Sequence, residues 1–82
     1  MSFDEFKDAV ATFAEGNGFD CSPIRNSKTA FALTGKDDRQ MYFWLEGGTA
    51  VASLRDFGAW ANFRSSDSQD FRAYLDSLSK SI

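Results

Sequence analysis

Five consecutive residues near the middle of the chain, 41–45, are apolar and read Met-Tyr-Phe-Trp-Leu. Successive side chains of a strand point to opposite faces of its sheet, so this segment is apolar on both faces. Such a strand needs cover on both sides, and a chain of 82 residues rarely supplies two covering layers. Either one face meets a partner, or another segment of the chain folds over it.

The composition is that of one compact domain, residues 1–82. Hydrophobic residues make up 43% and aromatic residues 16%, which is enough for a core and argues against disorder. No apolar run reaches the about 18 residues of a membrane span, and residues 1–5 lack a secretory hydrophobic region. A single cysteine, Cys21, allows no internal disulfide. We therefore expect a cytoplasmic protein.

The chain lacks histidine, which removes several common kinds of active site. No Ser-His-Asp or Cys-His system can form, and one cysteine without histidine cannot make a structural zinc site. The glycine-rich motifs that bind nucleotide phosphates are also missing. We expect no enzymatic activity, no metal and no cofactor.

The two ends of the chain have helical periodicity. The first helix begins with Ser2 and Glu5, which have the spacing of a capping box, and ends at the Gly-Asn-Gly of residues 16–18. The second helix follows the Ser-Ser-Asp-Ser of residues 65–68, and its expected capping pair is Ser66 and Gln69, which have the same spacing. Apolar residues recur every three or four positions in both, which indicates one buried stripe per helix. The stripes are Phe3, Phe6, Val10 and Phe13, and then Phe71, Tyr74, Leu75, Leu78 and Ile82.

Alternating patterns predict strands over residues 28–34, 39–46 and 49–55. Residues 35–38 form a turn, and Gly47-Gly48 is typical of a tight hairpin. We interpret residues 19–27 as a connector, because Pro23 excludes a central strand there. Residues 56–64 are either a short edge strand or an irregular aromatic loop.

The element order α-β-β-β-α predicts an α+β fold: a three-stranded antiparallel meander with both helices packed on one face. The helices should cover the face of Phe31, Met41 and Phe43. Tyr42 and Trp44 would then lie together on the opposite face.

That opposite face is the main candidate site. Tyr42 and Trp44, with Arg39, would contact a protein partner, since Trp, Tyr and Arg are the usual anchors of interfaces. Alternatively, the same aromatics would stack on single-stranded nucleic acid, with basic groups supplied by Lys28, Lys36 and Arg55. The face could also close a homodimer, or residues 56–64 could fold back and cover it.

Charge is unevenly distributed along the chain. Residues 1–20 carry a net charge of −4, whereas residues 21–64 carry +2. Asp4 and Asp8 form a secondary candidate, an acidic patch on the first helix that could occupy a basic groove of another protein. The alternative is an ordinary solvated helix face.

Short motifs recur in order along residues 3–64: Phe6, Ala9 to Gly18, Lys28 to Phe31, Tyr42 to Leu45, Gly47-Gly48 and Arg55 to Gly58. With these motifs, residues 3–64 resemble the small N-terminal segment that precedes the Toprim domain in many phage and plasmid primase-helicases. Those segments run from a short helix and a glycine, through a basic strand, to an aromatic hairpin that ends in a Gly-Asp-Trp-like corner. The chain has no Toprim acidic cluster and no helicase domain, so the resemblance implies a mobile-element origin without polymerase or ATPase activity.

The plan is also similar in architecture to stand-alone phage proteins that inhibit host defence, including some anti-CRISPR proteins. Together these resemblances suggest a non-enzymatic binding protein that inhibits or modulates a host nucleic-acid-processing or defence complex. The alternative is a small single-stranded nucleic-acid-binding accessory of replication.

Overall fold

The structure is a computed structural model that describes residues 1–54 and 62–81. It confirms the α+β class, but the sheet has five antiparallel strands where the sequence predicted three. The helices are α1 (Phe3–Asn17) and α2 (Ser68–Ser81). The strands are β1 (Asp20–Pro23), β2 (Ala30–Thr34), β3 (Gln40–Glu46), β4 (Thr49–Ser53) and β5 (Asn62–Ser65).

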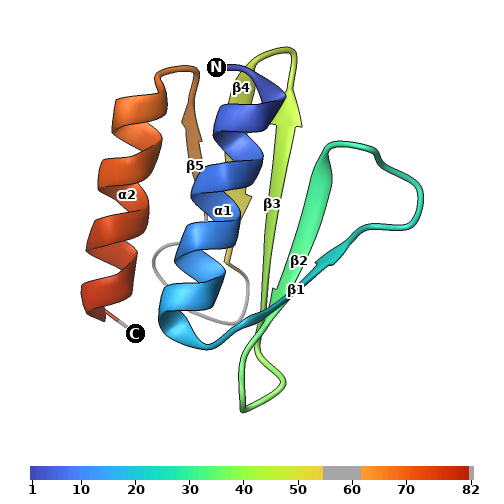
Figure 1. The fold of residues 1–82 in the computed structure, drawn as a ribbon, viewed down its shortest axis with the longest axis vertical. Coiled ribbons are helices and arrows are strands. Elements are labelled where there is room, and N and C mark those ends of the chain that lie inside the picture. Colours follow the sequence, from blue (N-terminus) through green and yellow to red (C-terminus); the bar gives the residue numbers. More distant parts are fainter. Residues whose placement is uncertain (55–61, 82) are drawn as a thin grey trace.

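The strands follow one another across the sheet in the order β1-β2-β3-β4-β5, so the sheet is a simple meander. Both helices lie against the same side of it and run in the same direction (Figure 1). The β1–β2 hairpin curls away from the helix layer at one edge of the sheet. The result is a two-layer domain with one sheet face under the helices.

The first helix starts where the capping pair predicted. The Ser2 side chain accepts a hydrogen bond from the Glu5 backbone N–H at 3.2 Å, and the Glu5 carboxylate accepts one from the Ser2 N–H at 3.0 Å. These two bonds satisfy backbone donors that a helix start otherwise leaves unpaired. The helix ends at Gly18, whose φ of 71° is left-handed and favours glycine.

Phenylalanine side chains join the helices to the sheet. Phe43 of β3 is fully buried and meets Phe13 of α1 and Phe71 of α2 edge-on, with ring centroids 6.0 and 6.2 Å apart. Edge-to-face pairs of this kind add to the gain from apolar burial. The buried core consists of Phe6, Ala9, Val10, Phe13, Ala14, Leu33, Met41, Phe43, Ala50, Ala52, Leu54, Phe71, Leu75 and Leu78.

The segment interpreted as a connector, residues 19–27, contains β1, so that interpretation was wrong. β1 pairs only with β2 and forms one edge of the sheet, with Pro23 as its last residue. This position suits proline, which cannot donate to a second neighbouring strand. All four residues of β1 are exposed, so no apolar alternation marked the strand.

The other edge strand is β5, at the end of the segment predicted as either an edge strand or a loop. Residues 55–61, including most of that segment, lie outside the described residues, as does Ile82. The second helix is capped by Asp67 rather than by Ser66, because the Asp67 carboxylate accepts the Gln69 N–H at 2.8 Å. A carboxylate at this position also favours the positive end of the helix dipole.

Candidate functional site

The side of the sheet away from the helices carries Tyr42 and Trp44. The strand registers place Trp44 between Ala30 of β2 and Val51 of β4, and Tyr42 between Ala32 and Ser53. No element in residues 1–54 or 62–81 lies over this side as α1 and α2 lie over the other (Figure 1). We call it the aromatic face, and define it by Ala30, Ala32, Tyr42, Trp44, Val51, Ser53 and Arg64.

Small residues surround the two aromatic rings. Trp44 and Tyr42 are both half-buried, whereas Ala30 and Val51 beside Trp44 are only 6% and 4% exposed. Large rings next to short side chains rise above the surface of a sheet, because cross-strand neighbours are about 5 Å apart. The geometry therefore leaves the edges and faces of the two rings partly accessible.

Polar contacts hold Trp44 in place. Glu46 accepts a hydrogen bond from the Trp44 side chain and another from the Arg64 guanidinium at 2.7 Å. These two bonds, with Trp44 the larger cause, lower the pKa of Glu46 below its ordinary value. Glu46 and Arg64 are 54% and 61% exposed, so the ion pair itself adds little stability, but it links the Trp44 indole to β5.

Tyr42 has a polar contact of its own. Its hydroxyl donates a hydrogen bond to the side-chain carbonyl of Gln40, two residues earlier on β3. Arg39, the third residue predicted for this site, lies one position before β3, in the turn that joins β2 to β3. Its carbonyl accepts the Gly35 N–H at 3.0 Å and closes that turn. Arg39 is thus at the end of the sheet, beyond Tyr42, and not beside Trp44.

The basic residues of the nucleic-acid alternative are not gathered at one place. Lys28 precedes β2 in the β1–β2 loop, and Lys36 follows β2 in the next turn, so the two cations lie at opposite ends of that strand. Arg55 lies outside the described residues. Within the described part of the chain, Arg64 is the cation on the aromatic face, and it is paired with Glu46.

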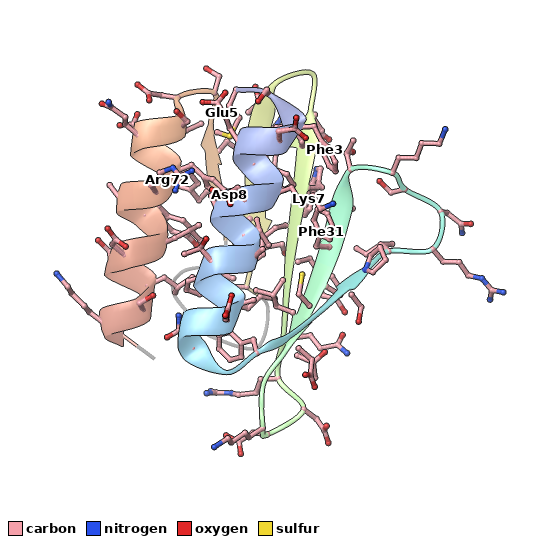
Figure 2. The ribbon with its side chains drawn as sticks, in the orientation of Figure 1. Phe3, Glu5, Lys7, Asp8, Phe31 and Arg72 are labelled. Carbon is pink, nitrogen blue, oxygen red and sulfur yellow. The ribbon has the colours of Figure 1, made fainter. Side chains whose placement is uncertain are left out.

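The acidic patch is on a different side of the molecule. Asp4 and Asp8 are exposed on α1, in the helix layer, so one flat partner surface cannot contact both the patch and the aromatic face. Asp8 forms an ion pair with Arg72 of α2 at 3.3 Å. Figure 2 shows the Arg72 side chain reaching from α2 toward Asp8. The patch therefore serves in part to join the two helices.

Two titratable side chains with raised pKa values are Cys21 and Tyr74. Partial burial raises the pKa of the Cys21 thiol, and burial raises the pKa of Tyr74 to about 12. Both groups therefore stay protonated at neutral pH, which makes neither a good nucleophile or base. Among residues 1–54 and 62–81 there is no cluster of acidic or cysteine side chains that could hold a metal ion. In the same ranges neither helix has the length and apolarity needed to cross a membrane.

Two features of the site could not be found from sequence. The contact between Glu46 and Arg64 depends on the pairing of β4 with β5, which no local pattern indicated. The Arg72–Asp8 pair joins residues 64 positions apart, on helices whose relative rotation the sequence does not define. By contrast, the shared face of Tyr42 and Trp44 follows directly from their spacing of two.

Comparison of the chain with protein-family models, with curated proteins and with solved structures found no match in any of the three.

Proposed function

We propose that this chain is a non-enzymatic binding protein that contacts a protein partner through the aromatic face. The observation that carries the proposal is the pairing of Tyr42 and Trp44, both half-buried, on the sheet side that neither α1 nor α2 covers. Aromatic side chains with a polar end suit interfaces, because they bury a large area and still satisfy a hydrogen bond. Exposed aromatic groups of this kind are typical of interaction sites.

The charge distribution favours a protein partner over single-stranded nucleic acid. Proteins that hold single strands combine stacking aromatics with a basic groove that follows the phosphates. Here Lys28 and Lys36 are separated by the whole of β2, and Arg64 is neutralised by Glu46. An approaching phosphate chain would also meet the Glu46 carboxylate beside Trp44.

The kind of partner is suggested by the resemblances of the sequence. They point to a phage or mobile-element protein that inhibits or modulates a host nucleic-acid-processing or defence complex, as anti-CRISPR proteins do. On this proposal Tyr42 and Trp44 occupy a surface of that complex, and the protein acts by excluding another ligand from it. The chain itself needs no cofactor for such a role.

The proposal is tested by capture from host lysate with immobilised wild-type protein and with the Tyr42→Ala/Trp44→Ala double variant. Lys36→Ala, a change in an exposed turn at the sheet end, is the matched control. We expect one host complex to be retained by the wild type and the control and lost by the double variant, with all three folded by circular dichroism.

A titration with single-stranded oligonucleotide completes the test. The chain also contains Trp60, so the Trp44→Ala variant is needed to assign any change in fluorescence. A salt-sensitive quench that disappears in Trp44→Ala would contradict the proposal and support the accessory of replication. A third outcome is a wild-type protein that is dimeric at micromolar concentration. If the Tyr42→Ala/Trp44→Ala double variant is then monomeric, the aromatic face is the interface of a homodimer.

A further inference from the structure

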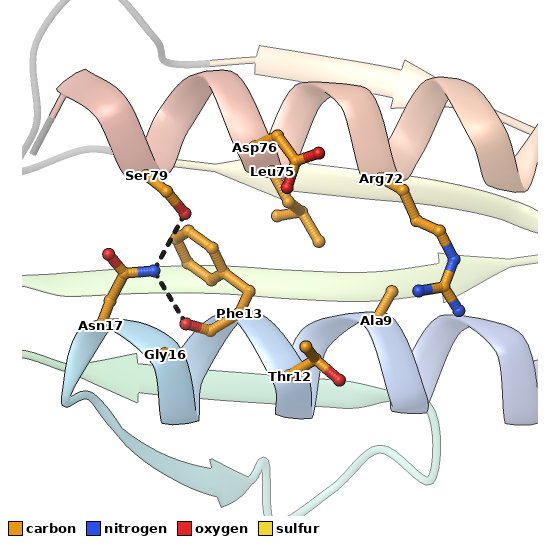
Figure 3. Close-up of a pocket in the computed structure, with 9 residues that line it drawn as sticks. All are labelled: Ala9, Thr12, Phe13, Gly16, Asn17, Arg72, Leu75, Asp76 and Ser79. Atoms are coloured by element: carbon orange, nitrogen blue, oxygen red, sulfur yellow. Dashed lines mark hydrogen bonds between the residues drawn. The ribbon is translucent and has the colours of Figure 1, made fainter.

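A concave surface lies between α1 and α2, on the opposite side of the molecule from the aromatic face. It is an open trough of about 290 Å³ whose floor is formed by Ala9, Phe13 and Leu75. The trough exists because α1 presents small side chains to α2: after Ala9 come Thr12 and Gly16, which leave the helices partly unfilled between them. Figure 3 shows Thr12 on one wall and Asp76 on the other.

Polar contacts close the trough at both ends. At one end Arg72 crosses from α2 to Asp8 of α1. At the other, the Asn17 amide donates hydrogen bonds to the Phe13 carbonyl at 2.9 Å and to the Ser79 hydroxyl at 3.0 Å (Figure 3). The Arg72–Asp8 pair and the Asn17–Ser79 bond join the two helices at the two ends of the trough. The trough is therefore a feature of the folded helix pair.

Asp76 is left without a cation partner in the described part of the chain. Arg72 is four residues before Asp76 on the same helix and Lys80 is four residues after it, spacings at which opposite charges can pair, but neither forms an ion pair with Asp76 in the described part of the chain. The structure instead directs the Arg72 guanidinium across the trough to Asp8. The Asp76 carboxylate is exposed on the wall of a trough with an apolar floor and polar walls, where a cation from outside the molecule can reach it.

The helix layer is also the acidic side of the protein. Within α1 there are four carboxylates and one lysine, and within α2 two carboxylates and two basic residues, so the layer carries the chain's net charge of −3. A field of this sign attracts basic segments and repels acidic ones. The apolar floor of the trough suits a side chain with an apolar stem, and the acidic helix layer suits a cationic, planar head group.

We propose that the trough receives an arginine side chain from a basic segment of a protein partner. The methylene stem lies on Phe13 and Leu75, and the guanidinium donates hydrogen bonds to the Asp76 carboxylate. This interaction uses the opposite side of the molecule from the aromatic face, so each surface can be tested without the other.

The experiment follows amide resonances of the labelled protein during titration with a short blocked peptide of alanine, serine and arginine. The control peptide has citrulline, which keeps the shape of arginine without its charge. Two variants each remove one negative charge. Asp76→Asn removes it from the trough, and Asp37→Asn removes it from the exposed β2–β3 turn. A third, Gly16→Leu, fills the trough, because the space around a side chain at Gly16 is empty.

We expect saturable shifts confined to residues around the trough, with binding weakened about ten-fold or more in Asp76→Asn and unchanged in Asp37→Asn. Gly16→Leu should fold normally and lose the shifts, and Trp44→Ala should keep them. Equal binding by Asp76→Asn and Asp37→Asn, equal binding of the citrulline peptide, or shifts spread over the whole acidic layer would overturn the proposal. So would the absence of shifts at millimolar peptide.

Discussion

The two faces of β3 differ in how an apolar side chain is covered. Met41 and Phe43 point to the helix layer, where they are 1% and 0% exposed. Tyr42 and Trp44 point the other way and remain half-buried, each with a polar contact on its own strand. The face of Met41 and Phe43 is thus fully used in packing against the helices. The face of Tyr42 and Trp44 keeps part of its aromatic surface accessible. The comparison teaches that neighbouring apolar side chains of one strand can differ widely in how far they are buried.

The largest expected effect comes from truncating the covered face. Phe43→Ala removes a fully buried ring that contacts both helices, so we expect a loss of about 3–5 kcal/mol in the free energy of unfolding. Urea denaturation followed by circular dichroism measures it. If Phe43→Ala lowers the free energy of unfolding by no more than Trp44→Ala does, the two faces of β3 do not differ in their contribution to stability, and the comparison is wrong.

On the aromatic face, Trp44→Ala should lower the free energy of unfolding by about 1–2 kcal/mol, because the ring is only half-buried and leaves a small cavity. The same denaturation experiment applies, with Trp44→Phe as a control that keeps most of the apolar area. Complete unfolding of Trp44→Ala at room temperature would show that this ring belongs to the core.

A smaller effect is expected for Tyr42→Phe, which removes only the hydroxyl that donates to Gln40. We expect a loss of about 0.5–1 kcal/mol, the usual net contribution of one hydrogen bond. If the Tyr42 hydroxyl contacts the partner, Tyr42→Phe should lower the free energy of binding to the partner by more than it lowers the free energy of unfolding. A change in stability as large as that of Phe43→Ala would be inconsistent with a partly solvated side chain.

The smallest effect is the pH dependence of Glu46. Its pKa in the folded protein is lowered from 4.5 by the bonds from Trp44 and Arg64. Because the folded value lies below the unfolded one, this contribution to stability is fully present above about pH 4.5 and is lost as the pH falls through the folded value. Because the chain also contains Trp60, the emission of Trp44 is taken as the difference from the Trp44→Ala variant. It should change in that window in the wild type and not in Glu46→Gln.

Glu5 provides the matched control from the helix layer. Its pKa is also lowered, chiefly by the hydrogen bond from the Ser2 backbone and then by the Ser2 side chain. Glu5→Gln should therefore alter thermal stability in the same acidic window while leaving the Trp44 emission change intact. An emission change that persists in Glu46→Gln would mean that the Trp44–Glu46 contact is not what the titration reports.

Sequence patterns predicted the parts of the fold in which burial is periodic. The stripes of α1 and α2 and the central strands are of this kind, since one face of each meets the core. β1 was missed because Asp20, Cys21, Ser22 and Pro23 are all exposed, and it is the backbone of this segment that pairs with β2. Backbone hydrogen bonds leave no trace in the pattern of side chains.

The candidate site divides in the same way. The neighbourhood of Tyr42 and Trp44 is a local consequence of strand geometry and could be predicted. The trough between α1 and α2 could not, since it depends on which faces of two distant helices meet. The separation of Lys28 from Lys36 could not be predicted either. A spacing of eight residues does not show whether a hairpin brings two side chains together, and only the strand order places the two lysines at opposite ends of β2.

The central claim, that the aromatic face binds a protein, is tested most directly by a photo-crosslinking amino acid placed at Trp44 and, separately, at Asp4 in the helix layer. With host lysate, we expect the probe at position 44 to link to one protein and the probe at position 4 not to link to that same protein. Crosslinking from position 44 to nucleic acid, or only to a second copy of the chain, would contradict the claim.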